Sequence, residues 1–199
     1  MQFMRSWKIL LLIVVVGIAI VGGVYVESGS SVSPNNTSNL LDRAIPSTSS
    51  DLDVAARTQL LKNLQTTTEA LKKDSTSYQD WIDLGIDRQI LGDYEGARLA
   101  WEYASFVFPK GAVAYANLGN LYMAYLKDYP KSESNYLQAI QLDPSNANDY
   151  RALFELYVYH YKQGTSAAEN ILKAGIRAAP QASDLKVLLE RYQAGERSF

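Results

Sequence analysis

The sequence contains no cysteine and only one histidine, His160. Without cysteine the protein has no disulfide, no thiolate nucleophile and no cysteine-ligated metal, and one histidine cannot form a multi-histidine metal site. No glycine-rich phosphate-binding loop follows a strand pattern, and the lysines and arginines form no basic run. The net charge of −2 gives no general attraction to nucleic acid. We therefore expect no cofactor, no metal and no nucleic-acid partner.

Few residues are candidates for catalysis. His160 lies late in a predicted helix, where an imidazole interacts favourably with the helix dipole. Asp80, Asp83 and Asp87 lie near one face of another predicted helix, and paired carboxylates can in principle do acid–base chemistry. A solvated acidic face beside Arg88 is the simpler interpretation. The sequence thus predicts no catalytic residue and no enzyme.

One long apolar run lies near the N-terminus. Residues 9–26, ILLLIVVVGIAIVGGVYV, carry no charge, and as a helix they would measure roughly 27 Å, close to the thickness of a bilayer's hydrocarbon core. Arg5 and Lys8 precede the run, which places the stub 1–8 in the cytoplasm and the rest of the chain outside. A cleaved signal peptide is the alternative, but its apolar core is usually shorter and a small-residue cleavage site follows it. We expect a retained single-pass signal anchor.

Two further features accompany this predicted anchor. Ala19 and Gly23 form a small-xxx-small pair that could support a homodimer, although ordinary glycines in a membrane helix explain them as well. Residues 27–50, ESGSSVSPNNTSNLLDRAIPSTSS, are rich in Ser, Asn, Thr and Pro and show no apolar period. That composition predicts a flexible linker, with a root-mean-square span of roughly 25–30 Å.

From residue 51 onward the pattern is helical, and no stretch alternates with the period of two that predicts a strand. Residues 51–77 read as one N-terminal helix. Apolar and small side chains at helical spacing then predict a pair of packed helices over 78–111, separated by the turn at Gly92. The residues that carry this pattern are Trp81, Leu84 and Gly85 in the first helix, and Ala97, Trp101, Ala104 and Pro109 in or after the second.

The same pattern recurs twice. Over 112–146 it is carried by Tyr115, Leu118, Gly119, Tyr122, Ser132, Tyr136, Ala139 and Pro144. The first helix repeats after 34 residues and the second after 35, so one residue has been added, and we place it at the turn near LKDYP. Over 147–182 the pattern is carried by Tyr150, Leu153, Tyr157, Ala168, Leu172 and Pro180.

This pattern resembles the tetratricopeptide repeat, W-x2-L-G-x2-Y followed by A-x3-F-x2-A and a proline. The resemblance covers residues 78–182 as three repeats. It departs at Arg88, where the family usually has tyrosine, and at Phe154 and Gly175, where we expect wider helix spacing. It implies an all-α fold, a right-handed solenoid of helical hairpins preceded by the transmembrane helix. Residues 51–77 would form a partial repeat, and 183–199 a capping helix and tail.

The resemblance also implies that the first helix of each hairpin lines a concave, partner-binding groove. By register that groove carries Gln79, Ile82, Ile86, Gln89 and Ile90, then Val113, Asn117, Asn120 and Met123, then Asn148, Arg151, Glu155 and Tyr159. Amides can bond an extended backbone and the apolar side chains offer shallow pockets, so a protein or peptide partner is expected. One branch of the family clamps chaperone carboxylates, but only Asn117 matches that set, and Ile82, Ile86, Asn148 and Ala152 do not.

The resulting hypothesis is a membrane-tethered, non-catalytic scaffold that displays a peptide-binding groove outside the cytoplasmic membrane, in a process such as envelope assembly or secretion. Anchoring would raise the local concentration of whatever binds. The alternative is a self-assembling structural module that forms homo-oligomers. In that case the predicted groove residues would pack against a second copy of the chain. Within one copy, some of them could instead pack against a neighbouring helix, or the N-terminal segment could fill the groove.

Overall fold

The computed structural model describes residues 37–46, 52–196 and 198–199. All described residues belong to one compact unit. Every regular element in this part is helical, which confirms the all-α prediction for the described residues. The predicted membrane anchor, 9–26, lies outside them. Within the described ranges, no helix combines the length and the hydrophobicity needed to cross a bilayer.

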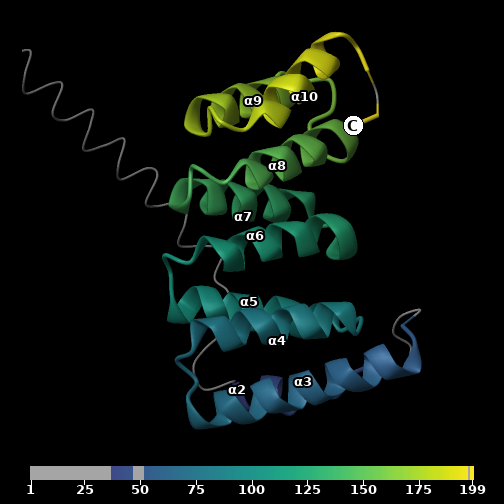
Figure 1. The fold of residues 1–199 in the computed structure, drawn as a ribbon, viewed down its shortest axis with the longest axis vertical. Helices are drawn as coiled ribbons and strands as arrows, with labels where there is room; N and C mark the ends of the chain where they lie inside the picture. The colour runs from purple at the N-terminus through teal and green to yellow at the C-terminus, as the bar shows by residue number, and fades with distance from the viewer. Residues whose placement is uncertain (1–36, 47–51, 197) are drawn as a thin grey trace, which may run out of the picture. The chain divides into compact units, whose positions relative to one another are not determined.

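The helices follow one another along the chain, and from α3 onward each packs against the next (Figure 1). In order they are α2 (Thr37–Leu41), α3 (Val54–Lys73), α4 (Tyr78–Ile90), α5 (Tyr94–Val107), α6 (Ala112–Leu121), the π-helical turn η2 (Tyr122–Leu126), α7 (Tyr129–Leu142), α8 (Ala147–Tyr159), α9 (Ala167–Ala178) and α10 (Ser183–Gln193). Short connections join α4 to α5 and α6 to α7, so each pair forms a helical hairpin. A longer connection joins α8 to α9.

Short polar side chains define where several helices begin. Asp53, Asp93 and Asp128 each precede a helix and accept a hydrogen bond from the backbone N–H three residues later, at 2.9, 3.0 and 3.2 Å. Ser77 does the same for α4. These bonds satisfy N–H groups that have no partner within the helix. Helices α5, α7 and α9 end two residues before Pro109, Pro144 and Pro180.

The residue added in the second hairpin lies in a helix and not in the turn. Helix α6 continues into the π-helical turn Tyr122–Leu126, after which Lys127 adopts a left-handed conformation with φ of 55°. The N–H of Asp128 then donates to the carbonyl of Tyr122 over 3.0 Å. A π-helical turn accommodates one extra residue without breaking the helix. Our placement of the insertion at the LKDYP turn is therefore corrected to residues 122–127.

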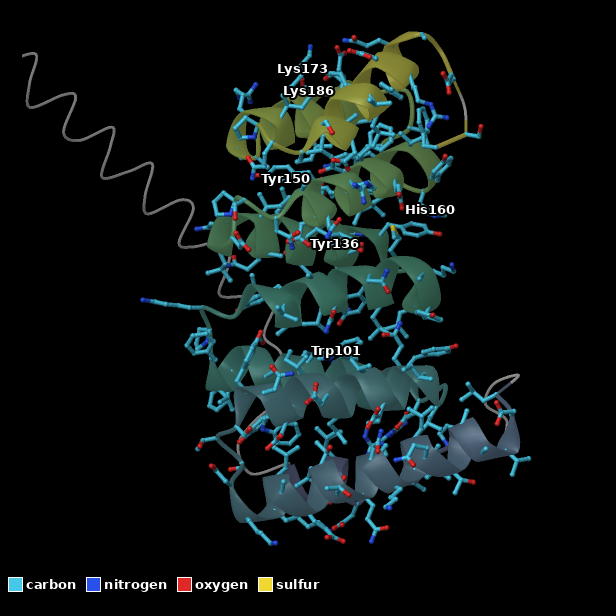
Figure 2. All side chains as sticks on the ribbon, in the orientation of Figure 1. Trp101, Tyr136, Tyr150, His160, Lys173 and Lys186 are labelled. Carbon is cyan, nitrogen blue, oxygen red and sulfur yellow. The ribbon has the colours of Figure 1, made fainter. Side chains whose placement is uncertain are left out.

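Glycine and a large ring occupy matching positions in the first two hairpins. A Cβ atom at Gly85 would lie 2.2 Å from Nε1 of Trp101, and one at Gly119 would lie 2.8 Å from the ring of Tyr136 (Trp101 and Tyr136 are labelled in Figure 2). In both hairpins the missing side chain lets the ring of the second helix approach the backbone of the first. In the third hairpin the large ring lies on the first helix, α8, because Phe154 replaces the glycine.

The buried side chains form two clusters. The first joins α2 and α3 to the hairpin α4–α5 and to α6, and the second joins α7 to α10. Most of the predicted packing residues are buried in this core: Trp81, Leu84, Gly85, Ala97, Trp101, Ala104, Leu118, Gly119, Tyr122, Ser132, Tyr136, Ala139, Tyr150, Leu153, Tyr157, Ala168 and Leu172. Tyr115 is half-buried, and the three prolines are exposed.

Residues 37–46 do not behave as a free linker. They include the short helix α2, and Leu40 and Leu41 are only 5% and 7% exposed, because they pack in the first core cluster. Helix α2 contacts both α3 and α5. We call residues 37–46 the strap. The predicted linker 27–50 is therefore wrong over this stretch, because two adjacent leucines supply apolar surface that the helices can bury. The rest of that linker lies outside the described residues.

Candidate functional site

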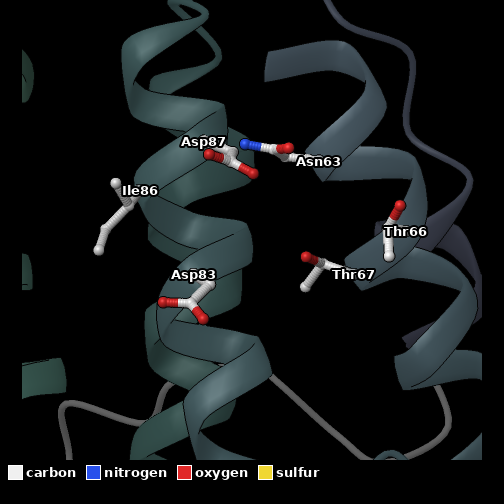
Figure 3. A pocket seen from close by; sticks show the side chains of 6 residues that line it. All are labelled: Asn63, Thr66, Thr67, Asp83, Ile86 and Asp87. Atoms are coloured by element: carbon white, nitrogen blue, oxygen red, sulfur yellow. The ribbon is translucent and has the colours of Figure 1, made fainter. Parts of the chain in front are cut away.

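A recess lies between α3 and α4 (Figure 3). Its volume is about 340 Å³, which is at the small end of the range for ligand pockets. It is lined by Asn63, Thr66 and Thr67 from α3 and by Asp83, Ile86 and Asp87 from α4. Each helix contributes side chains at i, i+3 and i+4, so the recess is a meeting of two helix faces.

The α3 side of the recess was not predicted. Asn63, Thr66 and Thr67 form a polar stripe next to the apolar stripe that buries Leu71 and part of Leu64. Nothing in the spacing of α3 indicates that this polar stripe faces another helix, since a solvent-facing stripe has the same composition. Only the packing of α3 against α4 brings the two sets together.

Two carboxylates give the recess an acidic character. Asp83 accepts a hydrogen bond from Nε2 of Gln79 over 2.8 Å. Burial raises the pKa of Asp87 to about 6, and the negative charge of Asp83 adds to the increase. Asp80, Asp83 and Asp87 are all half-buried. The predicted acidic face is therefore only partly solvated.

The predicted groove residues of α4 and α6 separate into accessible and inaccessible side chains. Ile82 is only 3% exposed and belongs to the core, so it is not available to a partner. Ile86 and Val113 are 39% and 52% exposed. The remaining residues of these two helices are Gln79 and Asn120, which are exposed, Ile90, which is 42% exposed, and Gln89 and Asn117, which are half-buried.

The predicted groove residues in η2 and α8 include some that contact other parts of the protein. Met123 lies in η2 and packs against the second core cluster. On α8, Arg151 forms an ion pair with Asp184 of α10 and donates to Oδ1 of Asn148 over 3.2 Å. Asn148 and Tyr159 are exposed and Glu155 is half-buried. Arg151 therefore pairs with α10 at the protein surface, which register alone did not indicate.

Two amides on α6 have different surroundings. The side-chain nitrogen of Asn117 is buried and has no hydrogen-bond partner. Asn120 forms a hydrogen bond with Tyr136, which opposes the larger effect of burial in raising the pKa of that phenol. Of the two, Asn120 is the amide that a partner's backbone can reach.

His160 takes part in a ring stack that recurs along the chain. It follows the last residue of α8 and stacks on Tyr129 of the preceding hairpin, with ring centroids 5.2 Å apart and an interplanar angle of 11°. The same arrangement occurs one hairpin earlier between Tyr94 and Tyr125, at 4.3 Å. No group of acidic or histidine residues in the described ranges could hold a metal ion.

Arg88 was noted in the sequence as a neighbour of the acidic residues and as a departure from the family's tyrosine, and its side chain is 0% exposed. Its Nη1 donates to Oδ2 of Asp93 over 2.6 Å, and its Nη2 donates to the carbonyls of Leu40 and Arg43 over 2.9 and 3.2 Å. Arg43 also donates from Nε to Asp93. Burial lowers the pKa of Arg88, and Asp93 opposes that change. The sequence signal that could have indicated this buried arginine was its position, where the family usually has tyrosine.

Helix α4 thus contributes to two different features. Its Asp83, Ile86 and Asp87 line the recess with α3, and its Arg88 donates hydrogen bonds to the strap. Comparison of the chain with models of known protein families and with curated proteins found no match.

Proposed function

We propose that this protein is a membrane-tethered scaffold of the tetratricopeptide type, which binds an extended segment of a protein partner along the first helices of its hairpins. Residues 9–26 would anchor it, and the helical unit would lie outside the cytoplasmic membrane. The proposal includes no chemistry on the partner. Its effect is to raise the partner's concentration at the membrane.

The observation that carries the proposal is the exposure of apolar side chains on the first helices of two successive hairpins. Ile86 and Ile90 on α4 and Val113 on α6 are 39%, 42% and 52% exposed. Exposed apolar side chains that continue from one element to the next mark interaction sites more often than isolated ones do. Ile86 also lines the recess beside α3.

Polar groups beside these apolar residues suit a peptide backbone. Gln79 and Asn120 are exposed, and amides both donate and accept hydrogen bonds. An extended peptide would place alternate side chains against Ile86 and Val113 and would bond the amides through its backbone. The repeated pairing of a glycine with a ring, which brings the helices of a hairpin together, supports the tetratricopeptide assignment.

Self-assembly is the second candidate, and one observation favours it. Phe106 and Phe108, at the end of α5, are 51% and 49% exposed. Phe108 packs edge-on against Tyr78, with centroids 5.4 Å apart. Aromatic side chains of this kind are enriched at interfaces between protein chains.

Cross-linking and affinity capture from membranes test the proposal. The full-length parent is compared with a variant carrying Ile86→Ser, Val113→Ser and Asn120→Ala, all at accessible positions. The matched control carries Val187→Ser and Lys186→Ala on α10, where Val187 is 53% exposed. We expect one stoichiometric partner with the parent and the control, and loss of that partner with the first variant.

Three results would contradict the proposal in whole or in part. Equal recovery of the same partner by all three proteins would remove the first helices as the binding face. Recovery of this chain alone would favour self-assembly, and replacing Phe106 and Phe108 by serine should then abolish the oligomer. Recovery of the protein in the soluble fraction would contradict the membrane anchor and leave the binding face to be tested separately.

A further inference from the structure

We propose that the face of the first hairpin that carries Arg88 is a peptide-docking site whose occupant is the protein's own strap. This docking is strong enough to hold the helical unit to its N-terminal anchor even when the chain is cut between the strap and α3. The part of this inference that concerns the membrane rests on the proposed function. The docking itself rests on the described residues alone.

The strap makes the two kinds of contact that a bound peptide makes, apolar side chains in a core and hydrogen bonds to its backbone. Leu40 and Leu41 insert into a core made otherwise by α3, α4, α5 and α6. Arg88 donates hydrogen bonds to two backbone carbonyls of the strap, those of Leu40 and Arg43. These partners are 48 and 45 residues away in the sequence, so their meeting reflects docking and not local chain geometry.

Charge complementarity adds specificity to the apolar contact. Nε of Arg43 lies 3.0 Å from Oδ1 of Asp93, whose carboxylate is 1% exposed. Asp93 thus joins an arginine of the hairpin and an arginine of the strap. Lys72 of α3 also pairs with Asp42 over 2.5 Å, but both side chains are at least half exposed, so this pair contributes little. The site therefore selects a Leu-Leu-x-Arg segment with an accessible backbone.

A protease test separates docking from covalent attachment. A recognition sequence with flexible flanks is inserted between Ser49 and Ser50 of the full-length protein, membranes are prepared, and the protein is cleaved to completion. We expect the helical unit, residues 50–199, to stay in the membrane pellet after cleavage. A variant carrying Leu40→Ser and Leu41→Ser should lose it to the supernatant.

Two further variants make the result specific. Arg43→Gln removes the ion pair to Asp93 without altering the core, and we expect partial release, so the test does not depend on folding of the double-serine variant. Asp42→Asn removes only the exposed pair with Lys72 and should behave as the parent does. Release of the parent upon cleavage to the same extent as the double-serine variant would overturn the proposal.

The same samples distinguish the other outcomes. If the uncleaved protein is already soluble, the membrane part of the proposed function has failed. Co-purification of the cleaved N-terminal fragment with residues 50–199 then still supports docking, and its loss overturns it. A cleaved complex that sediments as a dimer, and that becomes monomeric in the variant carrying Leu40→Ser and Leu41→Ser, would show that the strap comes from a second copy, which contradicts docking within one chain.

Discussion

Nη1 of Arg88 donates to Oδ2 of Asp93 over 2.6 Å, and the two side chains are 0% and 1% exposed. An ion pair so completely removed from water is costly to break by removing Asp93, because Arg88 would then be a buried charge with neither solvent nor a counter-charge. Asp93 also caps α5 by accepting from the N–H of Gly96 over 3.0 Å. The stability of the first hairpin and the docking of the strap therefore depend on one carboxylate.

We predict that Asp93→Asn destabilises the protein by about 3–5 kcal/mol, the usual cost of breaking a buried pair. Asparagine keeps the helix cap, so the loss reports on the missing charge. The matched control is Asp128→Asn, which alters the equivalent cap of α7, where the ion-pair partner Lys131 is 60% exposed. The control should change stability by less than about 1 kcal/mol. Urea unfolding of both variants makes the comparison, and equal losses would refute the prediction.

A methyl group at Gly85 should be incompatible with the ring of Trp101. The added Cβ would lie 2.2 Å from Nε1 of the indole, whose N–H donates to the carbonyl of Ile82 over 3.1 Å. We expect Gly85→Ala to cost about 1–3 kcal/mol, as overpacking does. Trp101→Leu in the same chain should make the alanine less costly, because it removes the colliding ring. Thermal unfolding of the two single variants and the double variant measures this coupling, and simple additivity would argue against it.

The stability of the protein should depend on Asp87 in a pH-dependent way. The pKa of Asp87 is raised to about 6 in the folded protein, above the value of about 3.9 typical of an unfolded chain. Between these values the folded state binds more protons, so the contribution of this group to stability falls as pH rises from about 4 to about 6. Asp87→Asn should therefore stabilise the protein at pH 7 more than at pH 4.

Unfolding midpoints of Asp87→Asn at pH 4 and pH 7 measure this difference. Glu190→Gln, at an exposed position on α10, is the control for a general change in net charge. An Asp87→Asn benefit that is the same at both pH values, or one that the control reproduces, would count against a buried carboxylate in the recess.

The stack between Tyr129 and His160 should couple neighbouring hairpins. Ring pairs contribute about 0.5–1.5 kcal/mol beyond the area that they bury. A double-mutant cycle with Tyr129→Ala and His160→Ala should give a coupling energy in that range, and the cycle for Tyr94 and Tyr125, 4.3 Å apart, should give a similar one. Zero coupling in both cycles would show that the stacks are incidental to packing.

Regular spacing made part of this structure predictable. Trp81, Leu84 and Gly85 are spaced three and four residues apart, so they lie on one face of a helix. The prolines mark helix ends because proline lacks an N–H group and clashes with the preceding turn. The all-α class and the burial of most packing positions follow from these local rules. The extra residue in the second hairpin was visible as a change of interval from 34 to 35.

Contacts between distant segments were not predictable in the same way. A leucine pair in a Ser- and Asn-rich stretch looks the same whether it is free or docked, and only the folded hairpin supplies Arg88 and the apolar surface that hold it. Ile82 was assigned to the groove by register, but its side chain is buried in the first core cluster. The inserted residue was expected in the turn near LKDYP, but the π-helical turn accommodates it, because a helix can absorb one residue by widening a turn.

Helix positions, helix ends and the repeated pattern of small and large side chains follow from neighbours three or four residues apart, and those neighbours are present in any short stretch of the chain. The recess, the raised pKa of Asp87 and the buried Arg88–Asp93 pair depend on which helix face meets which. That choice is made by the total burial of apolar surface over the whole helical unit, so it exists only once the chain has folded.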